Sequence, residues 1–295
     1  MKVEIECLSC IIHRGYLEIA EATKNPDLQF KAALALLEYM AKKFKPDAVA
    51  AVLGTARDRI IKQISGNLDV YAERKRVSNQ AALKLLPSIK NLIAKETSPD
   101  KKFRKACLAA IVGNIIEFDI PEHEVNFDQL EQLIANAEKD LAVDEIFGIY
   151  EEAKKAKNIL FLTDNAGEIV FDKLLVRELK QLGVEVTVVV KGGPVLNDAT
   201  LEDAKATSMY EVADAIITTG ADAVGMPLPE ERSEEFIKAY DKSDFIVAKG
   251  MGHVETLTEI KLKQPLAFLL RTKCNPVARY FGVMRGKNVA KLVKP

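Results

Sequence analysis

The chain has 295 residues, enough for one large domain or two modest ones with a buried core. Lysine and arginine total 42 against 43 aspartates and glutamates, a net charge of −1, which argues against nucleic acid or an anionic membrane as the partner. The composition, 48% hydrophobic and 29% charged, is that of a folded protein; no apolar run reaches the roughly 18–20 residues that span a bilayer, and four cysteines do not make a disulfide scaffold.

Residues 1–155 show helical periodicity almost throughout. Apolar residues recur every three or four positions, as in the series Phe30, Leu34, Leu37, Met40 and Ala41. Proline and glycine predict breaks between the helices, because proline lacks a backbone donor and restricts the residue before it. The predicted breaks are Asn25-Pro26, Lys45-Pro46, Ser65-Gly66-Asn67 and Ser98-Pro99. One long helix is expected over residues 69–95.

From residue 158 onward, short apolar runs alternate with helical patterns. The runs cover residues 159–162, 184–190, 215–218, 245–247 and 266–270. Such runs are typical of a parallel sheet that is covered on both faces. We predict an α/β fold, with a doubly wound, mainly parallel Rossmann-like sheet in residues 156–295 and an all-helical N-terminal part in residues 1–155. Since no glycine- or serine-rich linker separates the two parts, we expect them to share one core.

Polar, glycine-containing sequences follow the five predicted strands, at the edge where α/β sheets bind ligands. These are Thr163–Glu168, Lys191–Asp198, Thr218–Asp222, Lys249–Glu255 and Arg271–Asn275. Asp164, Asn165 and Asp198 offer oxygen ligands of the kind that Mg²⁺ or Mn²⁺ prefers. The cations Lys249, Arg271 and Lys273 could neutralise phosphate oxygens, and glycines such as Gly250 and Gly252 let the backbone approach an anion. The pattern predicts a divalent cation facing a phosphate group.

Each of these sequences also has a purely structural interpretation. Glu168 could stabilise a helix N-terminus, Asp198 could cap the helix after it, and Lys249 and Lys273 could be solvated strand ends. Five such sequences in succession favour a site over these alternatives. The sequence lacks the common nucleotide-binding motifs. It has no P-loop, and the G-x-G-x-x-G pattern that begins at Gly250 has Glu255 in place of its third glycine.

Together these sequences resemble the damage-control phosphatase superfamily of metal-dependent phosphatases, and the resemblance runs the whole chain. In the helical half, Asp69-Val70-Tyr71 and residues 113–118 look like family signatures. Cys7-Leu8-Ser9-Cys10 is similar to the CxxC of the stand-alone microbial subgroup, the nucleotide phosphatase I type. The resemblance implies that Asp164, Asn165 and Asp198 hold the metal and that Lys273 contacts the phosphoryl group.

The sequence departs from the family pattern at two positions. Another subgroup carries R-T-x-K, whereas Arg271-Thr272-Lys273 has no residue between threonine and lysine, so a role for Arg271 is in question. His253 stands where an asparagine is expected, and histidine, unlike asparagine, can titrate near neutral pH.

Cys7, Cys10 and His13 form C-x-x-C-x-x-H, which a helix would spread over an arc of roughly 120°. With Cys107 or Cys274 they could bind zinc; alternatively they form the apolar face of a first helix, or a redox dithiol. We favour the apolar face or an incidental metal.

Two asparagines of the helical half are expected to lie in different surroundings. Asn114, before Pro121, is predicted to reach over the sheet edge as a substrate contact. Asn79 is expected on a solvated helix face, and Arg74, Lys75 and Arg76 are expected to be an exposed charged stretch.

The sequence therefore predicts a cytoplasmic, metal-dependent phosphatase that hydrolyses phosphate monoesters of small metabolites, such as sugar phosphates, nucleotides or their damaged forms. Its expected cofactor is one divalent cation, Mn²⁺, Ni²⁺, Co²⁺ or Mg²⁺. The attacking group is left open between a water and Asp164. A Rossmann-like transferase using a nucleotide or S-adenosyl methionine and a non-catalytic phosphometabolite-binding protein are the alternatives. The predicted residues are catalytic Asp164, Asp198 and Lys273; substrate-binding Glu168, Asn114, Lys249, Gly250, His253 and Arg271; and metal-binding Asp164, Asn165 and Asp198.

Overall fold

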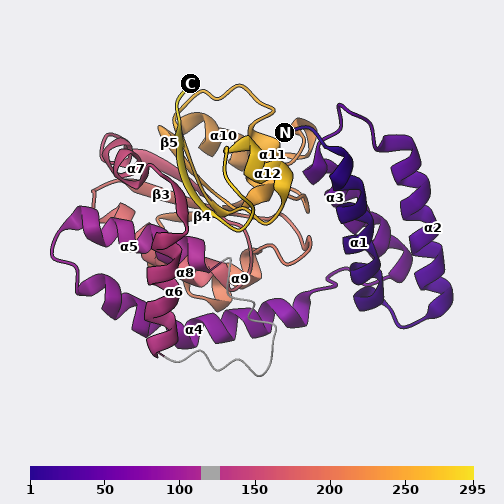
Figure 1. The fold of residues 1–295 in the computed structure, drawn as a ribbon, viewed down its shortest axis with the longest axis horizontal. Helices are drawn as coiled ribbons and strands as arrows, with labels where there is room; N and C mark the ends of the chain where they lie inside the picture. The colour runs from indigo at the N-terminus through magenta and orange to yellow at the C-terminus, as the bar shows by residue number, and fades with distance from the viewer. Residues whose placement is uncertain (114–126) are drawn as a thin grey trace.

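A computed structural model describes residues 1–113 and 127–295 of the chain (Figure 1). Its helices are α1 Ile5–Ala22, α2 Pro26–Lys43, α3 Ala50–Ser65, α4 Ala72–Ala94, α5 Pro99–Val112, α6 Phe127–Lys139, α7 Ile146–Ala153, α8 Glu168–Lys180, α9 Leu201–Ala206, α10 Glu234–Lys242, α11 Met251–Leu257 and α12 Asn275–Tyr280. Its strands are β1 Leu141–Asp144, β2 Asn158–Leu162, β3 Glu185–Val190, β4 Ala215–Thr218, β5 Phe245–Lys249, β6 Leu266–Arg271 and β7 Asn288–Val293.

The helix boundaries follow the predicted breaks. The side chain of Asn25 caps α2 by accepting a 2.9 Å hydrogen bond from the backbone N–H of Asp27, and Pro26 occupies the first helical position, where no donor is needed. Gly66 ends α3 with φ of 74°, a left-handed conformation that glycine adopts without steric cost. The predicted long helix is α4, which continues through Pro87.

The sheet has the order β1-β7-β6-β5-β2-β3-β4. Its central pairs are parallel, β7 runs antiparallel to β6, and β1 runs parallel to β7. Counted from β2, this is the 3-2-1-4-5-6 order of the doubly wound α/β fold. The predicted fold class is therefore confirmed. One strand lies in the part expected to be all helix: β1 has only four residues at a sheet edge, too few to show a two-residue periodicity against flanking helices.

Helices cover both faces of the sheet. Ile159 and Phe161 of β2 belong to the core cluster formed with α5 and α8. Leu160 and Leu162, which alternate with them, belong to a second cluster with residues of α10 and α11. This three-layer arrangement explains why β2 is apolar at almost every position.

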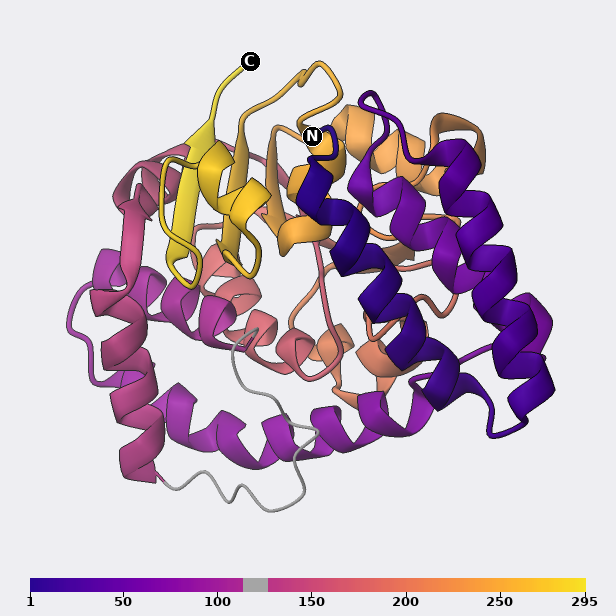
Figure 2. The ribbon, with the colours of Figure 1, turned by 45° about the vertical axis from the view of Figure 1, so that its right-hand side comes forward.

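The N-terminal helices divide into two groups by their packing. Helices α1–α3 bury small cores of their own, such as the cluster of Ile11, Leu36 and Met40. Buried residues of α4–α7 belong to the main cluster of the sheet. Figures 1 and 2 show α1–α3 gathered at one side of the molecule and α4 leading from them along the other layers. Within the described ranges, no helix has the length and hydropathy needed to cross a membrane.

Candidate active site

The strand order places a crevice between β2 and β5, the central neighbours at which the order of the strands reverses. Ligands of doubly wound sheets bind at this point, beyond the carboxyl ends of the strands. Asp164 and Asn165 follow β2, and Gly250 follows β5. The topology thus brings together two of the five polar sequences that lie almost 90 residues apart.

Backbone hydrogen bonds attach the loop after β2 to the loop after β3. Asn165 and Asp198 form an isolated antiparallel bridge. The N–H of Ala166 donates to the carbonyl of Asn197 at 2.9 Å, and the N–H of Ala199 donates to the carbonyl of Asp164 at 2.8 Å. Asp164, Asn165 and Asp198 are therefore held together by main-chain geometry, whatever their side chains bind.

Gly250 completes this arrangement because its missing side chain leaves room for Asp164. Its φ is 78°, and a Cβ atom there would overlap the Asp164 carboxylate. A glycine is needed both for the backbone conformation and for the close approach of β5 to the carboxylate.

A cavity of about 440 Å³ opens over these residues. Asp164, Asn165, Asp198 and Lys273 all line it, so the structure brings together the four residues predicted to bind metal and phosphate. Its opposite wall comes from the first group of helices, and its sides from the loops after β6 and α12. Lining residues from these walls include Cys7, Cys10, Arg14, Gly54, Arg57, Glu255, Cys274 and Arg285.

The carboxylates in the cavity lie in an environment that disfavours their charge. Burial, followed by the nearby charges of Glu168 and Asp198, raises the pKa of Asp164 well above its ordinary value, while Lys273 opposes the shift. Burial also raises the pKa of Asp198 to about 6. Carboxylates gathered in this way repel one another unless a positive charge lies between them.

The donor set fits a hard divalent cation. The Asn165 side-chain amide donates to Asp164 Oδ2 at 2.8 Å and to Glu168 Oε2 at 3.2 Å. Among the described residues, no donor binds the Asn165 amide oxygen. That oxygen and the carboxylates of Asp164 and Asp198 make an oxygen-only set, which suits Mg²⁺ or Mn²⁺ and leaves positions for water and substrate.

Lys191 lies beneath Asp198. It is not among the residues predicted to bind metal or substrate. Its ammonium is buried, donates to the carbonyl of Gly225 at 2.6 Å and lies 3.4 Å from Asp198 Oδ2. It lowers the pKa of Asp198 against the larger effect of burial. The signal that could have found it is a lysine directly after the apolar run of residues 184–190.

Lys249 lies elsewhere than predicted. Its side chain is fully buried under the sheet edge, where it contacts Glu168 Oε1, Asp172 Oδ1 at 2.9 Å and the carbonyl of Ala110 at 2.9 Å. With three acceptors its ammonium is saturated, and it is not part of the cavity wall. Lys249 and Glu168, both predicted to bind substrate, therefore form a buried ion cluster that supports the loop of Asp164.

His253 and Arg271 are also separated from the cavity lining. The buried His253 ring donates from Nε2 to the carbonyl of Thr163 at 3.1 Å, and burial lowers its pKa well below the ordinary value, so it is neutral. The Arg271 guanidinium binds the side chains of Asp140 and Asn288 on the far side of β6. The geometry gives neither residue access to substrate in this arrangement. Asn114, the remaining predicted substrate contact, lies outside the described residues.

Asn79 was predicted wrongly as a solvated residue. It is buried, accepts a 2.7 Å hydrogen bond from the N–H of Gly167 at the start of α8, and donates to Asp203 Oδ1 at 2.8 Å. Lys75, also expected to be exposed, is buried one turn earlier beside Asp69. The buried residues in this part of α4 are polar, because the helix packs against polar loop backbone there rather than against an apolar core. Since charged residues surround them in the sequence, the whole stretch resembles an exposed one.

The cysteine motif is split between two surfaces. Cys7 and Cys10 line the cavity together with Cys274, whereas His13 lies in a groove on the outer face of α1 and Cys107 is buried in α5. In the described part of the chain, no group of three histidine, cysteine or acidic side chains has the geometry to hold a metal ion.

Helix α3 supports the loop that carries Asp198. Asp58 Oδ1 accepts from the N–H of Leu196 at 3.1 Å, and Leu196 has an uncommon positive φ of 46°. Lys62 donates to the carbonyl of Pro194 at 2.6 Å and to Asp222 at 2.8 Å. Helices α1–α3 thus contribute to the shape of the loop that carries Asp198 as well as to the cavity wall.

Comparison with known proteins extends over nearly the whole chain. Residues 3–289 match the damage-control phosphatase ARMT1-like domain. A protein of Archaeoglobus fulgidus named damage-control phosphatase is 36% identical over 295 residues, covering 100% of both chains. The protein MJ0202 of Methanocaldococcus jannaschii is 39% identical over 293 residues, which cover 98% of this chain and 95% of that one.

The fold has a solved counterpart. The crystal structure of a DUF89 family protein from Pyrococcus horikoshii aligns with a TM-score of 0.88 at 35% identity, covering 98% of each chain. The chain is similar to these proteins from end to end. The similarity therefore includes the segments that form the crevice at the strand reversal, its acidic loops and the helical wall opposite. This chain belongs to the damage-control phosphatase ARMT1-like family.

Proposed function

We propose that this protein is a divalent-metal-dependent phosphatase that hydrolyses phosphate monoesters of small metabolites. The observation that carries the proposal is that Asp164, Asn165, Asp198 and Lys273 line one cavity at the strand reversal. Family membership supports phosphatase activity in metabolite damage control, as one relative is named a damage-control phosphatase. The four free thiols are compatible with a reducing cytoplasm, where we place the activity.

The proposed chemistry assigns separate tasks to the cavity residues. A bound Mn²⁺, Ni²⁺, Co²⁺ or Mg²⁺ would stabilise charge on the phosphoryl and leaving oxygens. Asp164, Asn165 and Asp198 would hold that cation, and Lys273 would contact a phosphoryl oxygen as a point charge. In this proposal Asp164 would either attack phosphorus and displace the alcohol of the ester or take a proton from an attacking water, and kinetics distinguish these two routes.

The cavity also limits the substrate. A volume of about 440 Å³ suits a small molecule rather than a phosphorylated protein surface. Its helical wall presents Arg14 and small or apolar residues, such as Ala51 and Gly54, to the part of the substrate beyond the phosphate. Sugar phosphates and nucleoside monophosphates are thus the substrate classes to test first.

The test is a hydrolysis assay on chelator-treated protein. We expect no turnover of p-nitrophenyl phosphate, sugar phosphates or nucleoside monophosphates until a divalent cation is added. Asp164→Asn and Asp198→Asn should each lose activity by about 100- to 1000-fold or more, and isothermal titration should show weakened metal binding. Lys273→Met should raise KM or lower kcat while metal binding is retained.

Two exposed residues serve as matched controls. Asp241→Asn and Lys263→Met change an ion pair on the surface and should leave kcat and KM unchanged. Full activity of the metal-free protein, or of Asp198→Asn, would contradict the proposal. Tight binding of phosphate esters without any turnover would instead indicate a metabolite-binding protein, and transfer of a group from a nucleotide cofactor would indicate the transferase alternative.

A further inference from the structure

Helices α1 and α2 expose a continuous apolar surface on the side of the molecule away from the sheet. The large side chains here are far more exposed than isolated surface residues need be: Ile5 is 81% exposed, Phe30 74% and Tyr16 64%. We call this surface the α1–α2 patch. Its members are Ile5, Leu8, Ile12, Tyr16, Phe30, Leu34 and Leu37.

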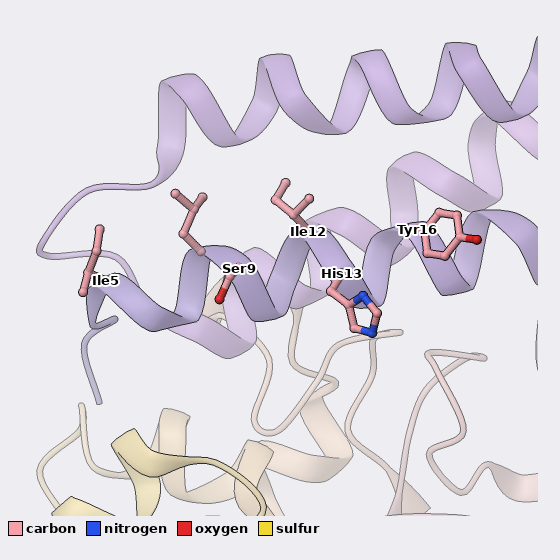
Figure 3. Close-up of a pocket in the computed structure, with 6 residues that line it drawn as sticks. Ile5, Ser9, Ile12, His13 and Tyr16 are labelled. Carbon is pink, nitrogen blue, oxygen red and sulfur yellow. The ribbon is translucent and has the colours of Figure 1, made fainter.

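The patch consists of two helical stripes. On α1 its members are three or four residues apart, which places them along one face beside the buried stripe of Cys7, Ile11 and Ile19. Figure 3 shows Ile5 and Ile12 pointing to the same side of α1, in a groove that Ser9, His13 and Tyr16 also line. Among the described residues, no aspartate, glutamate, lysine or arginine lines this groove.

The stripe on α2 repeats the arrangement. Phe30, Leu34 and Leu37 recur three or four residues apart, yet Ala32, Leu36 and Met40 are the residues that this helix buries. An amphipathic helix normally turns such a stripe toward a core. No described residue of this chain covers the patch, which leaves these side chains available to a partner.

A second copy of the chain fits the patch better than another partner. Two-fold symmetry is the commonest form of protein association, and it places the same surface on both partners. The two stripes are uncharged and would meet their own copies without like-charge repulsion. A membrane-binding helix would carry mainly lysines and arginines beside its apolar face. The polar positions along the α1 stripe are Ser9 and His13, and the exposed charged residues beside the α2 stripe are of mixed sign, Asp27, Lys31 and Glu38.

The exposure of the patch supports the same conclusion. Five of its seven side chains are at least half exposed, and its two aromatic members, Tyr16 and Phe30, are of a type that buries roughly 150–250 Å² each. The patch can therefore supply a large part of the roughly 800 Å² per partner of a standard interface. Monomeric proteins rarely expose contiguous apolar patches larger than a few hundred Å².

We propose that the protein is a two-fold homodimer in which the α1–α2 patches of two copies pack against each other as a four-helix arrangement. Phe30 and Leu34 of each copy lie in the contact. The cavity lies along the neighbouring face of α1, where Cys10 and Arg14 line it, and Ser9 borders both the cavity and the groove. This inference is independent of the proposed catalytic activity.

Sedimentation velocity tests the dimer on three proteins. We expect the wild type to sediment as a dimer at micromolar concentration. The double variant Phe30→Glu/Leu34→Glu should sediment as a monomer, because four carboxylates would meet across the interface. Phe147→Glu is the matched control: this phenylalanine of α7 is 68% exposed outside the patch, and its variant should remain dimeric.

A second measurement needs no variant. Carbene footprinting of the wild type should label Phe30 and Leu34 strongly in dilute solution and weakly at high concentration, while labelling of Phe147 should not change. A wild type that stays monomeric at 100-fold higher concentration would overturn the proposal. So would a dimer whose Phe30 and Leu34 stay fully labelled, or a double variant that is folded by circular dichroism and still dimeric.

Discussion

Gly250 and Gly66 both have a positive φ but differ in ψ and in their surroundings. Gly66 has φ of 74° and ψ of 2°, the left-handed conformation, and nothing lies within 4 Å of a Cβ placed there. Gly250 has φ of 78° and ψ of 170°, a region that is essentially restricted to glycine, and a Cβ there would overlap the Asp164 carboxylate. An alanine at Gly66 therefore meets only the cost of a left-handed L-residue, about 1–2 kcal/mol, whereas an alanine at Gly250 also displaces a site residue.

We expect Gly250→Ala to lose on the order of 100-fold in kcat/KM, because a carboxylate displaced by about 1 Å loses its alignment. Gly66→Ala should lose about 1–2 kcal/mol of stability and keep its activity. Steady-state kinetics and urea unfolding of both variants make the comparison. Equal activity of the two would mean that Asp164 does not need its present position.

Glu255 provides a pH test at the edge of the cavity. Burial raises the pKa of its carboxyl from 4.5 to about 7, although the N-terminal ammonium and Arg14 oppose the shift. Because the folded protein holds this proton more tightly than the unfolded chain, the contribution of Glu255 to stability is present below pH 4.5 and is lost as the pH rises toward 7.

We therefore expect Glu255→Gln to become more stable relative to the wild type as the pH rises from 4.5 to 7, with no further gain above that. Urea midpoints in chelator at pH 5, 6, 7 and 8 would show the trend. A stability difference that does not depend on pH would rule out the raised pKa.

At the scale of elements, the buried cluster of Lys249, Glu168 and Asp172 joins β5 to α8. Lys249 was predicted to bind substrate because it ends an apolar strand at the binding edge of the sheet. A lysine that binds substrate and a lysine that belongs to a buried ion cluster show the same sequence pattern at this position. The difference lies in Glu168 and Asp172, which sit one helical turn apart and face the strand only once α8 is docked.

Lys249→Met should destabilise the protein by about 3–5 kcal/mol, since it leaves two buried carboxylates without their cation. Lys242→Met, which removes an exposed ion pair with Glu185, should cost about 0–1 kcal/mol. Urea unfolding measures both. A stable Lys249→Met variant with only a raised KM would restore the substrate-binding role.

Asn79 links α4 to the N-termini of α8 and α9. Asn79→Ala should cost about 1–3 kcal/mol, because the buried N–H of Gly167 and the carboxylate of Asp203 each lose a partner. Gln80→Ala, on the exposed side of the same helix, should be nearly neutral in thermal denaturation. A similar loss in both variants would show that the helix, rather than its asparagine, is responsible.

At the scale of the whole molecule, the centre of the α/β sheet and the loops that carry Asp164 and Asp198 were predictable because their signals are local. Apolar runs identified the five strands β2–β6, and the polar sequences after β2 and β3 carry the two aspartates. The strands β1 and β7, at one side of the sheet, were not predicted. The wall from α1 and α3 was not predictable, since nothing in the periodicity of either helix shows that Cys10 and Gly54 face a cavity. The outward turn of Phe30 and Leu34 was hidden for the same reason: periodicity shows a stripe but not its partner.

The strand order also affects how the chain acquires its activity. β5 lies at the centre of the sheet beside β2, yet more than eighty residues separate Asp164 from Gly250 along the chain, so the crevice closes only after a long-range pairing. The contacts of α1–α3 with one another are more local and can form sooner. In refolding from urea, catalytic competence should therefore lag behind the recovery of helical circular dichroism, and simultaneous recovery would mean that β5 inserts before the helices are complete.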